Sequence, residues 1–191
     1  MRVKICGITR PEDARFAEKE GADAIGVVVC SPGSKREVSL DRAREIFLSV
    51  GPFVTTVAVT HTRSEEDLWE IFTIQPDAVQ IFHPFKRTSL TEVRIIQAIG
   101  KGEPLPEDCD AIIIDESHGS GTAFDLAGAK NAVQHAKVPV ILAGGLTPEN
   151  VEAAIRQVRP YAVDVATGVE VSPGIKDPAK VRAFIAASRR A

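Results

Sequence analysis

The sequence is poor in cysteine, and its few cysteines are not arranged for cross-linking or metal binding. Three occur in 191 residues, Cys6, Cys30 and Cys109, and no two of them have CxxC spacing. An odd, widely separated set argues against a disulfide framework and against a structural zinc site. It is typical of a reducing compartment, so we expect a cytoplasmic protein with no metal centre.

The chain also lacks the features of a membrane protein, a secreted precursor or a nucleic-acid binder. No apolar run approaches the roughly 20 residues that a transmembrane helix needs. Strand and helix signals begin at the first residues, so we expect no signal peptide. The formal net charge of -3 is not the basic excess of a nucleic-acid-binding surface. We therefore expect neither a membrane nor a nucleic acid among its partners.

What the chain does contain is a regular alternation of short apolar runs and amphipathic segments. Most of the runs are rich in Val and Ile without strict alternation, which is typical of parallel strands buried on both faces. We expect eight such strands, which begin at Val3, Ala24, Phe53, Ala78, Arg94, Ala111, Val138 and Ala162.

Helix-start signals follow most of these strands. A capping oxygen, or a proline at the first helical position, marks a typical start. In one segment we expect Thr147 to be the N-cap and Pro148 the first helical residue. The helices are expected within residues 10–21, 39–51, 64–74, 147–160 and 177–190, with a further one after Asp125.

About eight strand–helix repeats predict a single (β/α)8 barrel domain over residues 1–191. An open doubly wound sheet is the alternative, but no GxGxxG motif follows the first strand. The stretches "HPFKRTSLTEV" and "GKGEPLPEDCD" leave room for only one or two helical turns each. We therefore expect helices 4 and 5 of the barrel to be shortened or degenerate.

Candidate site residues lie where a barrel places its chemistry, at the carboxyl ends of the strands. Lys4 and Cys6 share one face of the first strand and are expected to point into the barrel. A nearby cation favours the thiolate, which is a base or a nucleophile; otherwise Cys6 is a small buried hydrophobe. Lys4 either supports that thiolate or pairs with an inward carboxylate such as Asp164.

Anion-binding groups follow three other strands. Arg36 follows the second strand, where its planar fork suits a carboxylate or a phosphate, although a solvated loop charge is the commoner case. Gly144 and Gly145 follow strand seven, and Thr167 and Gly168 follow strand eight. Paired loops of this kind fit the phosphate site of many barrels, or else they are two ordinary turns.

Two acidic residues complete the candidate set. Asp164 is expected to face the barrel interior, where a carboxylate is costly unless it is paired or used. Asp125 leads into a helix after strand six, so it is either the N-cap of that helix or an acid at the barrel mouth. The two roles are compatible.

Six motifs occur in a fixed order along the chain: "KICGIT", "SKREV", "GSGTAFDL", "LAGGLTPENV", "YAVDVATGVE" and "IKDPAKVRAFI". Together they resemble the phosphoribosylanthranilate isomerase family over nearly the whole chain. The resemblance implies an isomerase of tryptophan biosynthesis that is a monomer or homodimer and needs no cofactor. Its reaction is the Amadori rearrangement of N-(5-phosphoribosyl)anthranilate, a small molecule, to 1-(2-carboxyphenylamino)-1-deoxyribulose 5-phosphate.

The resemblance also implies a role for each candidate residue. Cys6 matches the general base, Asp125 the general acid, and Arg36 the arginine that meets the anthranilate carboxylate. Asp164 matches an acidic residue near the sugar hydroxyls, and the phosphate loops match Gly144, Gly145, Thr167 and Gly168. The chain departs from the family in "QIFHPF" after strand four, where "QLHG" is usual, and in Ala166 and Thr167, where "SSG" is more common.

Two alternatives stay open. The first is a related isomerase acting on the aminoaldose of the histidine pathway, a type of barrel that uses carboxylates at the ends of strands one and five. Here strand one ends in Cys6, which disfavours it. The second is a phosphate-binding barrel without activity, for which the shortened middle third is the only support.

Overall fold

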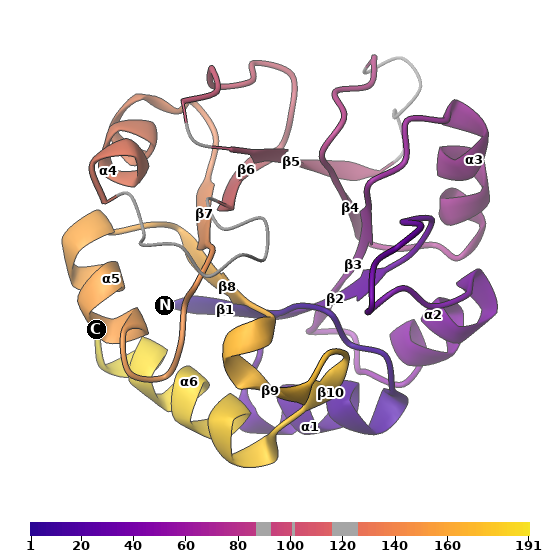
Figure 1. Ribbon diagram of the computed structural model, residues 1–191, viewed down its shortest axis with the longest axis horizontal. Helices are drawn as coiled ribbons and strands as arrows, with labels where there is room; N and C mark the ends of the chain where they lie inside the picture. The colour runs from indigo at the N-terminus through magenta and orange to yellow at the C-terminus, as the bar shows by residue number, and fades with distance from the viewer. Residues whose placement is uncertain (87–92, 101, 116–125) are drawn as a thin grey trace.

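Eight parallel strands close into a barrel, with helices around its outside (Figure 1). The computed structural model describes residues 1–86, 93–100, 102–115 and 126–191. Each strand pairs with the next one along the chain, and the last returns to pair with the first, which confirms the predicted barrel and excludes the open sheet. The strands are β1 Arg2–Ile5, β2 Ala24–Val28, β3 Thr55–Thr60, β4 Ala78–Ile81, β5 Arg94–Ile99, β6 Ala111–Asp115, β7 Val140–Ala143 and β8 Ala162–Val165.

The helices begin largely where the capping signals place them. Ser39, Ser64 and Asp177, the first residues of three of the predicted helical segments, each accept a hydrogen bond from a backbone N–H group of the first helical turn and are the N-caps of these helices. The helices are α1 Pro11–Glu20, α2 Leu40–Phe47, α3 Glu65–Thr73, α4 Leu126–His135, α5 Val151–Val158 and α6 Pro178–Arg190.

The predicted start of α5 is wrong. Its N-cap is Asn150, and Thr147 and Pro148 lie in a turn that precedes the helix. The Asn150 side chain accepts from the Thr147 N–H at 2.8 Å and donates to the Gly145 carbonyl at 2.9 Å. This amide holds the chain in a turn against the glycine loop after β7, so the helix begins only at Val151.

The predicted shortening of two helices agrees with the described part of the chain. No α-helix occurs among the described residues of 82–93 and 100–110, which connect β4 to β5 and β5 to β6. The described residues of 102–110 run as a loop beside β5 and β6 (Figure 1). None of the helices in the described ranges has both the length and the apolar character needed to span a membrane.

Strand residues divide between two apolar layers. Val3 and Ile5 belong to the larger layer between strands and helices, whereas Cys6 belongs to the smaller layer inside the barrel. Lys4 is buried and lies on the inward side with Cys6, because alternate residues of a strand share a face. The prediction that Lys4 and Cys6 point into the barrel is therefore confirmed.

One element was not expected from the sequence. After β8 the chain makes a 3-10 turn, Thr167–Val169, and then a small antiparallel hairpin of β9, Glu170–Ser172, and β10, Ile175–Lys176. The hairpin lies between α6 and α1 in the view of Figure 1. It returns the chain to the barrel mouth before α6 begins.

Candidate active site

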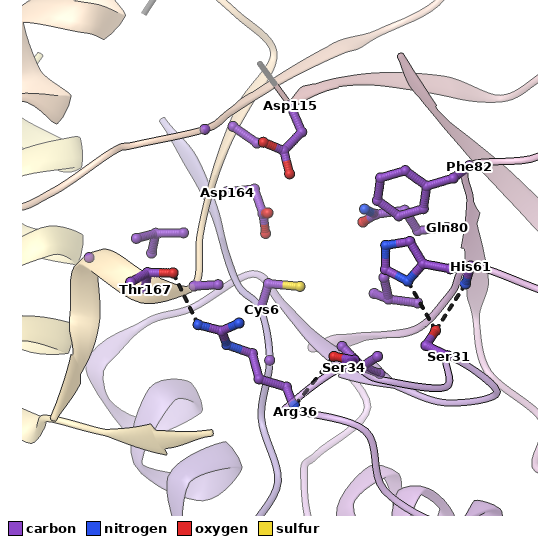
Figure 2. A pocket seen from close by; sticks show the side chains of 18 of the residues that line it. Cys6, Ser31, Ser34, Arg36, His61, Gln80, Phe82, Asp115, Asp164 and Thr167 are labelled. Atoms are coloured by element: carbon purple, nitrogen blue, oxygen red, sulfur yellow. Dashed lines mark hydrogen bonds between the residues drawn. The ribbon is translucent and has the colours of Figure 1, made fainter. Parts of the chain in front are cut away.

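A cavity of about 590 Å³ opens at the carboxyl ends of the strands. Residues of the loops after β1, β2, β7 and β8 contribute to its wall, and Figure 2 shows the side chains of Cys6, Arg36 and Asp164 turned toward one common space. Seven of the predicted site residues line it: Cys6, Arg36, Gly144, Gly145, Asp164, Thr167 and Gly168. The eighth, Asp125, lies outside the described residues.

Cys6 is held at the end of β1 by the neighbouring strands. Its backbone N–H donates to the Val165 carbonyl of β8 at 2.8 Å. On the other side lies Gly26 of β2, where a Cβ atom would come within 2.8 Å of the Cys6 Sγ and 3.0 Å of the Lys4 Nζ. The missing side chain at Gly26 leaves the room that the thiol and the lysine occupy inside the barrel.

Lys4 is buried inside the barrel, in contact with two residues that line the cavity, Asp164 and Gln80. Its Nζ lies 2.9 Å from the Asp164 Oδ1 and donates to the Gln80 Oε1 at 3.1 Å. Lys4 and Asp164 are cross-strand neighbours of β1 and β8. Burial would lower the pKa of Lys4, but the charges of Asp164 and Cys6 outweigh it and raise that pKa. Lys4 therefore carries its positive charge inside the barrel.

The thiol of Cys6 feels two opposing influences. Burial raises its pKa above the ordinary value, and the positive charge of Lys4 acts in the opposite direction. Of the charged groups acting on Cys6, Lys4 exerts the strongest effect toward the thiolate. Cys6 is thus a buried thiol, and the fixed positive charge of Lys4 lies two residues before it on the same face of the chain.

Arg36 reaches the cavity by passing over the loop after β1. At Gly7, whose φ is +71°, a Cβ atom would lie 2.5 Å from the Arg36 Cδ, so only glycine leaves this path open. The guanidinium donates to both carboxylate oxygens of Glu170, at 2.8 and 2.7 Å, and to the Thr167 Oγ1 at 3.0 Å. Arg36 is therefore joined to the loop after β8.

The two glycine loops meet at close range. Gly144 and Gly145 have φ values of +86° and +64°, a conformation that glycine adopts without a Cβ penalty. At Gly168 a Cβ atom would lie 2.0 Å from the Leu146 carbonyl oxygen. The loops after β7 and β8 pack backbone against backbone here, and their three glycines line this end of the cavity together with Leu146 and Thr167.

The opposite wall carries an aromatic pair that the sequence did not reveal. The rings of His61 and Phe82 stack with centroids 4.1 Å apart and planes inclined by 18°. The His61 backbone N–H donates to the Ser31 Oγ at 2.9 Å, and the His61 Nδ1 lies 3.0 Å from the same oxygen. Figure 2 shows this group facing the cavity across from Asp164 and Arg36.

Several other functional candidates were also missed. Gln80 and Asp115 line the cavity from β4 and β6, and both stand at or near the carboxyl end of a strand. That position was the signal that would have found them. Glu170 had no such signal, because it comes from the unexpected hairpin. Among the described cavity-lining residues there is neither Cys30 nor Cys109.

Comparison with known proteins places this chain in a family. A family model described as N-(5'phosphoribosyl)anthranilate (PRA) isomerase matches residues 3–187. The N-(5'-phosphoribosyl)anthranilate isomerase of Methanoregula boonei is 61% identical over 191 residues, covering 100% of this chain and 98% of that protein.

Solved structures agree with the sequence match. A phosphoribosyl anthranilate isomerase in complex with reduced 1-(o-carboxyphenylamino)-1-deoxyribulose 5-phosphate has a TM-score of 0.85 at 35% identity, with 100% of both chains covered. Monomers generated from the dimeric Thermotoga maritima enzyme give a TM-score of 0.85 at 34% identity, again with 100% of both chains covered. This chain belongs to the N-(5'-phosphoribosyl)anthranilate isomerase family.

Proposed function

We propose that this chain converts N-(5-phosphoribosyl)anthranilate to 1-(2-carboxyphenylamino)-1-deoxyribulose 5-phosphate in tryptophan biosynthesis, with Cys6 as general base and Asp125 as general acid. The observation that carries the proposal is the shared cavity, in which Cys6, Arg36 and the two glycine loops meet. Membership of the isomerase family supplies the reaction class.

The cavity suits a substrate with two anionic ends. A phosphate is proposed to bind at the loops of Gly144, Gly145, Thr167 and Gly168, which line the cavity and where the three glycines carry no side chain to cover the backbone. The anthranilate carboxylate is proposed to bind Arg36, whose guanidinium matches two oxygens. Asp164, on the cavity floor, is proposed to lie near the sugar hydroxyls.

The proposed chemistry begins with two proton transfers. Asp125 gives a proton to the ring oxygen, which opens the furanose ring and leaves an iminium ion. The iminium acidifies the proton on C2′, and the Cys6 thiolate removes it to form an enolamine. The enolamine then tautomerises to the ketone. Proton transfers of this kind need neither a metal nor an organic cofactor.

The assignment of the acid rests on the motif "GSGTAFDL", since Asp125 lies outside the described residues. The assignment of the base is supported by the position of Cys6 in the cavity wall and by the Lys4 charge behind it. For assembly and location we propose a cytoplasmic monomer or homodimer. The Thermotoga maritima relative is described as dimeric.

The direct test uses the purified full chain and follows the loss of phosphoribosylanthranilate fluorescence. The aminoaldose of the histidine pathway is assayed side by side. We expect turnover of the first substrate and none of the second, together with rescue of a tryptophan auxotroph. Turnover of the histidine-pathway compound alone would reverse the choice of substrate. Folded protein that binds the product and turns over neither compound would indicate a barrel without activity.

A further inference from the structure

We propose that Glu170 is a positioning residue: it holds the Arg36 guanidinium so that one fixed edge is left for the substrate carboxylate. Lys176 in turn fixes Glu170. The inference rests on the proposed function, because it concerns how the same site recognises the carboxylate of the anthranilate ring.

Glu170 and Thr167 already occupy part of the Arg36 guanidinium. Arg36 donates from Nε and Nη2 to the two oxygens of Glu170, and Nη2 also donates to Thr167. A guanidinium has five N–H donors in a rigid plane. The Nη1 group has no hydrogen-bond acceptor among the residues that the structure describes. A carboxylate from the substrate therefore meets the Nη1 side of a guanidinium that cannot rotate freely.

Glu170 is itself held by residues of the hairpin. Its side chain is only 3% exposed, and its Oε1 lies 2.9 Å from the Nζ of Lys176. The same oxygen accepts from the Gly174 N–H at 3.1 Å. The Lys176 Nζ also donates to the Ala166 carbonyl at 3.3 Å. Glu170 thus has partners on the hairpin as well as on Arg36, and these hairpin contacts hold its carboxylate independently of Arg36.

The three charged side chains do not cancel one another. One carboxylate lies between two cations, so the cluster of Arg36, Glu170 and Lys176 carries a net charge of about +1. The Lys176 side chain is 2% exposed, whereas Arg36 is 23% exposed and lines the cavity. The net positive charge of this cluster is therefore presented to the substrate through Arg36.

The same cluster also contacts the loop that follows Cys6, the proposed base. The hairpin turn at Gly174 accepts a hydrogen bond from the Thr9 Oγ1 at 2.6 Å, in the loop that follows β1. Arg36 crosses the same loop at Gly7, the residue after Cys6. The short segment of residues 6–9 thus carries the thiol and contacts both Arg36 and the hairpin, so the substrate ring is fixed relative to Cys6 before any proton moves.

A positioning role predicts a specific kinetic signature. The carboxylate is bound in the ground state and in the transition state alike, so its loss raises KM more than it lowers kcat. For Glu170→Gln we expect KM to rise roughly 10- to 100-fold, the range expected for hydrogen bonds to charged groups. We expect kcat to change by less than about threefold.

The experiment compares two inhibitors on the wild type and on Glu170→Gln. One is reduced 1-(o-carboxyphenylamino)-1-deoxyribulose 5-phosphate, and the other is its descarboxy analogue, which carries a phenyl ring in place of the carboxyphenyl ring. We expect Glu170→Gln to weaken the carboxylated inhibitor roughly 10- to 100-fold and to leave the descarboxy analogue within about twofold. In an Arg36→Met background the same Glu170 substitution should change neither.

A control distinguishes the positioning of Arg36 by Glu170 from the effect of leaving the Lys176 ammonium unpaired. Glu170→Gln leaves a buried ammonium without its carboxylate, whereas the double variant Glu170→Gln/Lys176→Met removes both charges. We expect the double variant to regain thermal stability without regaining affinity for the carboxylated inhibitor. Recovery of that affinity, or an equal loss for both inhibitors, would overturn the inference. A wild type that turns over no phosphoribosylanthranilate would instead overturn the proposed function.

Discussion

The ammonium of Lys4 and the carboxylate of Asp164 lie 2.9 Å apart inside the barrel, as neighbours on β1 and β8. Both side chains are buried, so each compensates a charge that the interior would otherwise penalise. Lys4 also acts on Cys6, which follows it on the same face of β1. Both suggested purposes of Lys4, the carboxylate pair and support of the thiolate, are thus compatible with its position.

Removal of Lys4 is predicted to make the thiolate of Cys6 harder to form. Burial raises the pKa of Cys6 and the Lys4 charge opposes that rise. In Lys4→Met the pKa of Cys6 should therefore move further up, and the ascending limb of kcat/KM should move to higher pH. The measurement is the pH dependence of Cys6 alkylation by iodoacetamide in a Cys30→Ser/Cys109→Ser background.

The matched control for this prediction is Lys4→Met/Asp164→Asn. Asp164 raises the pKa of Cys6 by a smaller effect than that by which Lys4 lowers it. The double variant should accordingly titrate between the wild type and Lys4→Met. An alkylation profile of Lys4→Met that coincides with that of the wild type would show that Lys4 does not support the thiolate.

A methyl group at Gly168 is predicted to disturb the phosphate loops. Its Cβ would lie 2.0 Å from the Leu146 carbonyl oxygen, so the two loops must separate. We expect Gly168→Ala to lose about 1–3 kcal/mol of unfolding free energy and to weaken inhibition by inorganic phosphate about tenfold. Gly51→Ala is the control, because its new methyl group meets only the end of the Glu18 side chain. Equal phosphate inhibition of both variants would argue against these loops as the phosphate site.

Acid is predicted to abolish the stabilising effect of Glu170. Burial would raise the pKa of Glu170, but hydrogen bonds from Arg36 and the charge of Lys176 outweigh it and lower that pKa below the ordinary 4.5. Stabilisation by the carboxylate is therefore complete above pH 4.5 and is lost as the pH falls through the folded-state pKa.

Thermal unfolding from pH 7 to pH 3 measures this effect. The Tm difference between wild type and Glu170→Gln should shrink as the pH falls below 4.5, the ordinary pKa, because protonated Glu170 resembles glutamine. Glu45→Gln is the surface control, since its pairing with Arg42 is exposed and contributes little. A Tm difference that is constant over the whole range would show that Glu170 has no lowered pKa.

Much of the barrel could be predicted from the sequence because buried parallel strands leave a plain pattern. The runs that begin at Ala24 and Ala111 form β2 and β6 because segments rich in Val and Ile suit burial on both faces. Phe53 marks the limit of that reasoning. It was expected to begin a strand, but it is 97% exposed and β3 starts at Thr55.

In the candidate site, a residue could be predicted only where its own type and its position in a strand were enough to place it in the cavity. Cys6 and Asp164 follow from the inward face of a strand, and their place in the cavity wall agrees with that reasoning. The Arg36–Glu170 contact could not be predicted, because it joins residues 134 positions apart through a hairpin without a sequence signal. The stacking of His61 on Phe82 likewise depends on the register of two strands rather than on either local sequence.

The central claim is that Cys6 and Asp125 transfer the two protons of the rearrangement. The measurement that tests it most directly is kcat/KM for phosphoribosylanthranilate in Cys6→Ala and in Asp125→Asn, with Cys109→Ser as the control thiol variant. We predict losses of about 10²–10⁴-fold for the first two, the contribution of a positioned acid or base. Cys109→Ser should stay within about twofold of the wild type. Undiminished turnover in Cys6→Ala or in Asp125→Asn would contradict the assigned roles.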